Sequence, residues 1–122
     1  MPRWGSIVNL SRSGEQVARV HWCQSFLCRL RGLTFRRSLA MGEGLLLVER
    51  SEGRSNTAIH MWMVFFPITA VWLDKDFQVV DLKLAKPWRV YMPRKPAKYV
   101  LEGSVEMMQR LSLGDKLDWR DA

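Results

Sequence analysis

The longest apolar run lies in the middle of the chain, where Ala58 to Leu73 has the sequence AIHMWMVFFPITAVWL and no charged residue. Sixteen residues fall short of the ~20 that a helix needs to cross a bilayer. The run also contains Pro67 and is rich in β-branched and aromatic residues, which favour strands. We therefore predict two buried strands that bend at Pro67, and no membrane span.

Shorter strands are expected on both sides of this run. Alternating apolar and polar residues, or brief apolar runs between glycine and charged residues, predict strands over 16–22, 44–49, 78–84, 98–102 and 115–119. In the strand over 78–84, Asp81 and Lys83 alternate with Leu82 and Leu84, so one face is expected in the core and the other in water. Leu73 to Val79 then forms a hairpin.

The remaining segments predict an irregular loop and two short helices. Residues 86–96 contain three prolines and allow at most a short edge strand. Ser25 can cap a helix that closes at Gly32. Ser104 can cap a second helix that ends at Gly114 and carries on one side Val105, Met108 and Leu111.

Together these elements indicate a mainly β (α+β) fold. Strands and helices do not alternate regularly, which argues against a doubly wound sheet. We predict a compact barrel- or sandwich-like mixed sheet of six or seven strands with two short helices. Residues 1–15 are expected to be an N-terminal arm or a weak first strand, and 16–122 a single β-rich domain.

Composition agrees with one globular domain. The chain has 122 residues, 48% of them apolar, and six tryptophans and five phenylalanines can build a core without metals or disulfides. The N-terminus lacks the apolar core of a secretory signal, so a cytoplasmic location is expected. Cys23 and Cys28 lack the second ligand pair that a zinc site needs, and their spacing does not match Cys-x-x-Cys. We expect two reduced thiols, at least one buried as a small apolar side chain.

Six short motifs occur in a specific order between about Val20 and Trp119. They are RLRGLTFRRSL, GEGLLLVE, IHMWMVFFPITAVWLDKDFQVVD, KPWR, KYVLE and LSLGDKLDW. In this order they resemble the domain of unknown function 192 family. The resemblance implies a compact, mostly β domain with a barrel- or sandwich-like sheet and short helices, and no established activity. Many relatives are exported or tethered behind a signal peptide, which this chain does not show.

Several positions depart from the family's pattern. Thr69 stands where the family usually has an aspartate after proline and a hydrophobic residue, so an acidic group is missing. Phe77 follows Asp76 in the hairpin turn, where the family usually has the glycine best suited to positive φ. The segment before the last strand is shorter and lacks the usual glycine near Glu106. We therefore transfer no reaction from the resemblance.

His60 is the most distinctive polar residue because it lies inside the apolar run. An imidazole there either makes a hydrogen bond to backbone or carboxylate in the core, or lines a pocket. Glu102, in the motif that matches the family's VLE, and Glu43, in GEGL, are its candidate partners. The candidate ligand pocket therefore consists of His60, Trp62, Glu102 and Glu43, and a purely structural histidine is the alternative.

The sequence predicts no catalytic or metal site. His21 and His60 are far apart, and neither has an acidic residue at a ligand spacing. A nucleophile formed by Cys23 or Cys28 with His60 would lack a glycine-rich elbow. No glycine loop for phosphate is present either. We expect no metal and no cofactor, and we do not expect an enzyme.

The formal net charge is +7 and the sequence pI is about 10.0. This charge is compatible with nucleic acid, an anionic membrane surface or an acidic partner, and equally with a protein that is merely kept soluble. One basic group consists of Arg29, Arg31, Arg36 and Arg37. A second, over 83–99, interleaves cations with rings as single-strand binding requires, through Lys86, Trp88, Arg89, Tyr91, Arg94, Lys95 and Lys98. The alternative is a solvated loop that covers the sheet edge.

The leading functional hypothesis is a non-catalytic binding module for a small or anionic ligand, with its pocket near His60, Trp62 and Glu102. The second is a nucleic-acid-associated protein that binds single strands through 83–99. A hydrolase or transferase comes third, because no complete catalytic constellation is visible.

Overall fold

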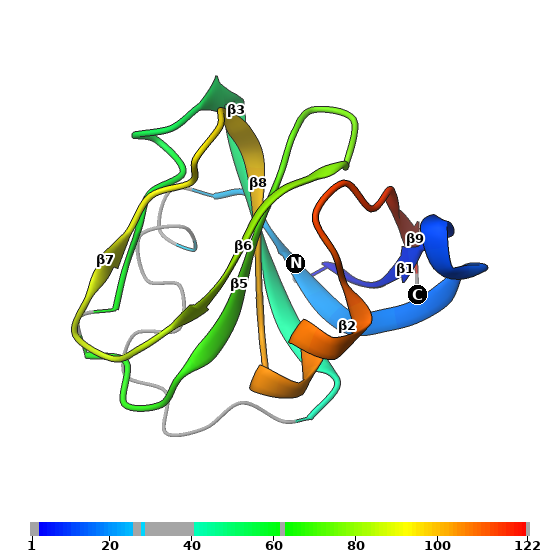
Figure 1. The fold of residues 1–122 in the computed structure, drawn as a ribbon, viewed down its shortest axis with the longest axis horizontal. Helices are drawn as coiled ribbons and strands as arrows, with labels where there is room; N and C mark the ends of the chain where they lie inside the picture. The colour runs from blue at the N-terminus through cyan, green and yellow to red at the C-terminus, as the bar shows by residue number, and fades with distance from the viewer. Residues whose placement is uncertain (1–2, 26–27, 29–40, 62, 122) are drawn as a thin grey trace.

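A curled seven-stranded mixed sheet forms the body of the molecule (Figure 1). The computed structural model describes residues 3–25, 28, 41–61 and 63–121. The strands of the sheet lie in the order β6-β5-β8-β3-β2-β1-β9. In chain order they are β1 (Arg3–Asn9), β2 (Glu15–Cys23), β3 (Glu43–Gly53), β5 (Ile68–Leu73), β6 (Val79–Ala85), β8 (Ala97–Gly103) and β9 (Leu117–Asp121).

Smaller elements accompany this sheet. Two short strands, β4 (Ile59–His60) and β7 (Val90–Tyr91), pair with each other in a separate ribbon. Two 3-10 helices, η1 (Leu10–Arg12) and η2 (Val105–Arg110), lie beside the sheet. β2 and β3 pair in parallel, and the other neighbours in the sheet are antiparallel. The predicted mainly β, sandwich-like mixed sheet is confirmed, and the stretch expected to be an arm or a weak strand supplies β1.

The sheet curls until its two edges meet without forming a closed barrel. Val79 N donates to Asp115 O and Leu117 N donates to Phe77 O, both at 2.9 Å. Gln78 and Lys116 form an isolated bridge between these hydrogen bonds. The start of β6 is thereby fastened to the chain that leads into β9. This contact brings the turn before β6 close to the C-terminal strand.

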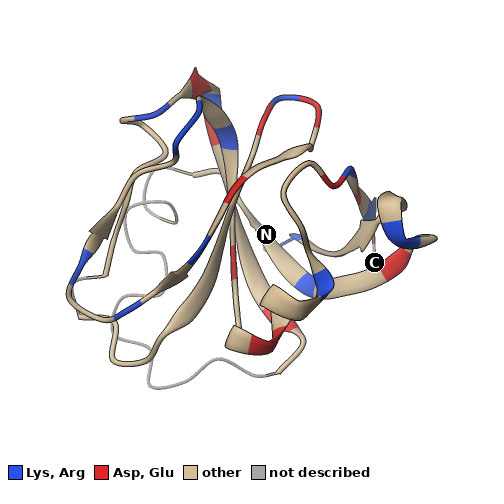
Figure 2. Ribbon diagram, in the orientation of Figure 1, with Lys and Arg blue, Asp and Glu red and all other residues tan. Residues whose placement is uncertain are grey.

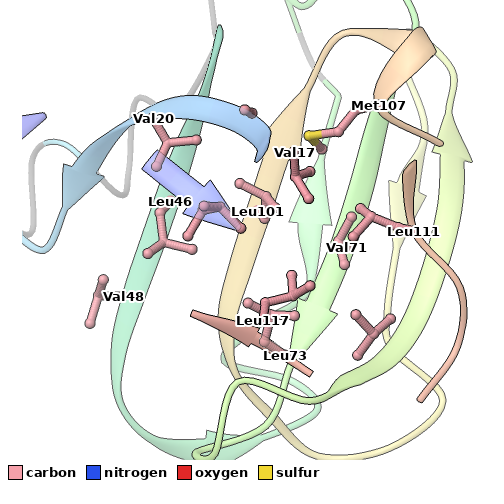
Figure 3. Packing of buried hydrophobic residues seen from close by; sticks show 13 residues of the cluster. Val17, Val20, Leu46, Val48, Val71, Leu73, Leu101, Met107, Leu111 and Leu117 are labelled. Carbon is pink, nitrogen blue, oxygen red and sulfur yellow. The ribbon is translucent and has the colours of Figure 1, made fainter. Parts of the chain in front are cut away.

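Alternation along the strands separates the buried residues into two clusters on opposite faces. Leu46, Leu101 and Val71 are cross-strand partners and lie inside the curl, where Leu111, Leu117 and Met107 of other elements cover them (Figure 3). The other face carries Leu47, Val100 and Trp72, and it is covered by the β4–β7 ribbon and the chain near it, through Ile59, Met61, Val64 and Tyr91. The two-layer arrangement follows from the period of two in a strand.

The long apolar run is a strand only in its second half. Ile68–Leu73 is β5 and is buried at every position, as predicted. The first half was expected to be a second buried strand, and this is wrong: only Ile59–His60 is a strand, and Met63 has a left-handed φ of 59°. That conformation ends the alternation, so Val64 is buried while Phe65 is 55% exposed. No described helix is long and apolar enough to span a bilayer.

The predicted hairpin from Leu73 to Val79 is present, and its turn keeps a position of positive φ although the glycine best suited to it is missing. Phe77 occupies the left-handed position with a φ of 63°. Asp74 Oδ1 accepts hydrogen bonds from Asp76 N and Gln78 N, both at 2.9 Å, and so holds the turn together. A phenylalanine tolerates this backbone because its ring packs against Tyr99, with ring centroids 4.5 Å apart.

Two predictions of side-chain placement are wrong. Asp81 was assigned to a solvated face of its strand, but it is fully buried, and Leu84 on the other face is 45% exposed. The helix after Ser104 is a short 3-10 helix that ends at Arg110 and buries Met107 instead of Met108 and Val105. A 3-10 helix repeats every three residues, so the predicted α-helical face does not apply.

Asp81 is buried because it fastens a loop to the sheet. Its carboxylate accepts hydrogen bonds from Leu82 N at 2.8 Å and Arg94 N at 2.9 Å, and Lys83 Nζ lies 3.5 Å away. Burial raises the pKa of Asp81. The backbone hydrogen bonds from Leu82 and Arg94, together with the charges of Lys83 and Arg94, lower the pKa by more than burial raises it. The pKa of Asp81 therefore lies below its usual value.

Cys23 and Cys28 form a disulfide, so the predicted pair of reduced thiols is wrong. Cys23 ends β2, and Ser25 Oγ accepts a hydrogen bond from Cys28 N at 3.1 Å, as an N-cap residue does. This turn leaves the two Cα atoms 5.6 Å apart, within the range that a disulfide needs. The rest of the helix predicted over 25–32, and all four arginines of the first basic group, lie outside the described residues.

Breaking the disulfide is expected to reduce the free energy of unfolding by about 2 kcal/mol, the loop-closure entropy of so short a loop. The test is urea unfolding of the protein and of the Cys23→Ala/Cys28→Ala variant, together with a thiol count in denaturant. A count of two thiols without reductant, or identical unfolding midpoints, would contradict the disulfide.

Candidate functional site

The described residues of the predicted pocket lie in different parts of the fold. His60 is exposed and pairs through its backbone with Val90 in the β4–β7 ribbon. Glu43 starts β3 and lies 3.6 Å from Arg19 Nη1. Glu102 is buried in β8, and Trp62 lies outside the described residues. Within the described part of the chain no hydrogen bond or ion pair connects His60 to either glutamate, and the pocket stays a prediction.

Glu102 is nevertheless chemically unusual. It is 5% exposed, and its cross-strand partners are Leu45 and Ala70, both members of the cluster under the β4–β7 ribbon. No hydrogen bond or ion pair to its carboxyl group is found among the described residues. Burial raises the pKa of Glu102 to about 7. The side chain is therefore a buried acid that changes charge near neutral pH.

An open hollow lies elsewhere, where the turn before β6 meets β1, β2 and β9. It has a volume of about 520 Å³. Strands β1 and β9 and the turn before β6, which contribute to its lining, lie on the side of the molecule opposite β7 (Figure 1). Its lining residues come from the two ends of the chain and from the turn: Arg3, Leu10, Trp22, Lys75, Asp76, Phe77, Lys116, Leu117, Asp118 and Trp119.

One wall of the hollow is aromatic. The rings of Trp22 and Trp119 meet edge to face with centroids 5.0 Å apart. The guanidinium of Arg3 lies 5.1 Å from the Trp22 ring and 5.4 Å from the Trp119 ring, and it is held by Asp121 at 2.9 Å. Strand pairing creates this wall, because β1 lies between β2 and β9 and brings both rings together. A Cβ atom at Gly5 would collide with the Trp119 ring, so glycine is required there.

The rim of the hollow carries charges of both signs. Lys116 Nζ donates a hydrogen bond to Asp76 O across the fastened edge. Asp118 pairs with Arg120 Nε at 3.0 Å, which satisfies one of the two acids of the lining. Lys75 is exposed, and its ammonium group has no hydrogen bond or ion pair within the described residues. The rim therefore has spare positive charge beside an aromatic wall.

The residues that line this hollow are not grouped by any pattern in the sequence. Trp22, Phe77 and Trp119 are separated by most of the chain, and only the antiparallel pairing and the edge contact bring them together. The one available signal was the turn at Asp76 and Phe77, where a bulky residue takes a position that favours glycine. That residue packs beside Tyr99 and lines the hollow.

The basic segment over 83–99 does not form a single surface. Lys86 and Arg89 lie in the loop before β7, at either side of Trp88, which is 47% exposed. Tyr91 packs against the cluster under the ribbon, and its hydroxyl accepts a hydrogen bond from Lys86 N at 2.8 Å. The other cations have different partners. Arg94 pairs with Asp81, and Lys98 lies over the ring of Tyr99. Lys95 is exposed.

The described residues contain no group of three or more His, Cys, Asp or Glu side chains that could hold a metal ion. His21 packs instead against Trp4, with ring centroids 5.4 Å apart.

The protein is a small β-rich domain: a curled mixed sheet with a separate β4–β7 ribbon and an aromatic hollow at its fastened edge. The chain belongs to the DUF192 family, described as an uncharacterized ACR, whose model matches residues 8–119. This match confirms the family resemblance of the six motifs.

Relatives in sequence and solved structures are also similar to this chain. A UPF0127 protein of Thermococcus kodakarensis is 36% identical over 115 residues, which is 93% of this chain and 72% of that protein. A UPF0127 protein of Pyrococcus abyssi is 34% identical, with 94% and 97% covered. A "putative transcription regulator" from Sinorhizobium meliloti has a TM-score of 0.82 at 22% identity, with 98% and 94% covered. A protein of unknown function from Novosphingobium aromaticivorans has a TM-score of 0.78 at 18% identity, with 97% and 85% covered. These two likenesses show the fold alone.

Proposed function

We propose that the protein is a non-catalytic binding module for a small ligand that combines a planar ring with a negative charge. The observation that carries the proposal is the open hollow with Trp22 and Trp119 in its wall and Lys75 at its rim. Its volume of about 520 Å³ lies in the range of ligand pockets, roughly 300–1,000 Å³.

The chemistry of the lining supports this class of ligand. Aromatic walls bind flat rings by stacking or edge contacts, and a nearby ammonium group attracts a carboxylate, sulfonate or phosphate. Arg3 is already held by Asp121 and Lys116 donates to Asp76 O, so Lys75 is the lining cation whose ammonium group has no partner among the described residues and can face a ligand. Among the described residues, the lining contains no His, Cys or Ser that could act as a base or nucleophile, which favours binding over catalysis.

Naphthalene-2-sulfonate is a suitable probe because it has a flat ring and one anionic group. Calorimetric titration is expected to show saturable binding. Trp119→Ala should weaken it about tenfold by removing the ring contact, and Lys75→Glu about threefold by reversing an exposed charge.

Matched controls separate the site from general effects. Trp4→Ala removes a tryptophan that lies outside the hollow, and Lys95→Glu reverses an exposed charge elsewhere. Both should bind like the unaltered protein. Since Trp119 also packs against the inner core, Lys75→Glu keeps the test valid if Trp119→Ala folds poorly. Equal weakening by site and control variants, or no saturable binding, would overturn the proposal.

A further inference from the structure

An exposed apolar patch lies on the β4–β7 ribbon and the two chain segments beside it, far from the hollow. Phe65 is 55% exposed and Trp88 47%, and their ring centroids are 6.0 Å apart. Val90 is 59% exposed on β7, and Met63, two residues before Phe65, is 39% exposed. The ribbon forms one edge of the molecule, on the side away from both chain termini (Figure 1). Large side chains that gather at such an edge indicate an interaction surface.

The backbone under this patch is strained. Met63 has a φ of 59° and Trp88 a φ of 65°, and such values are unfavourable for bulky side chains. The two segments support each other: Met61 N donates to Arg89 O at 2.7 Å, and Trp88 N donates to Met61 O at 2.8 Å. The fold thus holds two bulky apolar residues outward in a conformation that asparagine or glycine would adopt at lower cost.

The charge of the chain is concentrated in the same part of the sequence. Residues 54–73 and 82–101 contain seven Lys or Arg and no Asp or Glu. The remaining sequence holds twelve of each sign, so these two segments carry the whole formal charge of +7. Figure 2 shows blue positions and no red along the ribbon and its connecting loops. Lys86 lies two residues before Trp88 and Arg89 directly follows it, whereas Asp81 compensates Lys83 and Arg94 at the base.

We propose that the tip of the β4–β7 ribbon, formed by Met63, Phe65, Trp88 and Val90 with Lys86 and Arg89, docks onto an anionic lipid surface. Aromatic and aliphatic side chains then enter the interface between headgroups and acyl chains, and the two cations contact the acidic headgroups. Methionine and valine offer no face on which a base can stack, so the tip fits lipid better than a single-stranded nucleic acid. The inference is independent of the hollow and of its ligand.

Flotation with lipid vesicles tests this docking directly. The protein is expected to bind vesicles of phosphatidylcholine with 30% phosphatidylserine, and to bind pure phosphatidylcholine far less. Lys86→Gln/Arg89→Gln should reduce partitioning about 30-fold, since each cation near the surface contributes a factor of about five. Met63→Asn/Trp88→Asn should reduce it about tenfold or more. Asparagine suits the left-handed backbone, so this variant should unfold at the same or a higher temperature.

Matched variants and a competing ligand complete the experiment. Arg110→Gln/Arg120→Gln removes two exposed charges, and Leu113→Asn removes an exposed apolar side chain, both away from the ribbon. These variants, like Lys75→Glu, should partition as the unaltered protein does. Equal loss in ribbon and control variants, or no preference for phosphatidylserine, would overturn the proposal. The proposal would also be overturned if the protein bound a labelled oligothymidine but not vesicles, and if Met63→Asn/Trp88→Asn weakened the binding of the oligothymidine.

Discussion

Raising the pH from 4.5 to 7 is expected to lower the free energy of unfolding by about 3 kcal/mol through Glu102 alone. Burial raises the pKa of Glu102 from 4.5 to about 7 in the folded protein. Between these values the unfolded chain has released the proton while the folded chain still binds it, so stability falls as pH rises. At pH 7 the folded protein is about half ionised, so this contribution becomes constant only when the pH is about one unit higher and both states are ionised.

Glu102→Gln should remove this dependence, because an amide has nearly the same shape and does not titrate. Urea unfolding at pH 5 and pH 8 gives the comparison. The variant is expected to be the more stable protein at pH 8 and to lose its advantage at pH 5. Glu43→Gln, at a partly exposed glutamate paired with Arg19, serves as the control and should leave the pH dependence unchanged. A variant that keeps the full pH dependence would show that Glu102 does not cause it.

Trp72→Ala is expected to lower the free energy of unfolding by about 4 kcal/mol. Trp72 is fully buried among the residues between the sheet and the ribbon. Its Nε1 donates a hydrogen bond to Thr57 O at 2.7 Å, which fastens the chain near β4 to the sheet. The substitution leaves a large cavity and a buried carbonyl oxygen without its donor.

Trp72→Phe separates these two effects, because it fills most of the space but cannot donate the hydrogen bond. We expect a loss of about 2 kcal/mol for this variant. Chemical denaturation with tryptophan fluorescence and circular dichroism measures both losses. Trp4→Ala, at a tryptophan that is only partly buried, is the control and should cost about 1 kcal/mol. If both Trp72 variants unfold like the unaltered protein, the ribbon is not fastened through this side chain.

The sequence was sufficient for the fold wherever local pattern determines burial. Ile68–Leu73 is buried at every position, and the hairpin that follows it lies where alternation resumes. The local pattern was not sufficient where one backbone conformation interrupts it. Met63, in a left-handed conformation, turns an expected strand into an irregular segment with an exposed ring at Phe65. Nothing in the composition of that run distinguishes the two outcomes.

Long-range contacts account for the other differences. Asp81 follows a strand pattern that places it in water, but its burial depends on Arg94, a residue beyond the next loop. The disulfide was missed because spacing alone does not show that a turn brings Cys23 and Cys28 together. The predicted cytoplasmic location rested on the absence of a secretory signal pattern at the N-terminus, and it stays a prediction. Disulfides persist in oxidising compartments, so the thiol count bears on location as well.

Long-range contacts also decide which residues form a binding site, as the hollow and the predicted pocket show. His60 and Glu102 were grouped because both belong to family motifs, yet one is exposed on the ribbon and the other is buried in the sheet. Trp22 and Trp119 belong to different ends of the chain and were not grouped at all. Their contact depends on the position of β1 between β2 and β9, a feature of topology that no single motif contains.

Indole N–H resonances give the most direct test of ligand binding in the hollow. The protein has six tryptophans, of which Trp22 and Trp119 line the hollow and Trp72 is buried in the other cluster. Titration with naphthalene-2-sulfonate, followed in ¹H–¹⁵N correlation spectra, should shift the indole signals of Trp22 and Trp119 and saturate, while the signal of Trp72 stays in place. Signals of Trp22 and Trp119 that do not move, or shifts confined to Trp88 on the ribbon, would contradict the account.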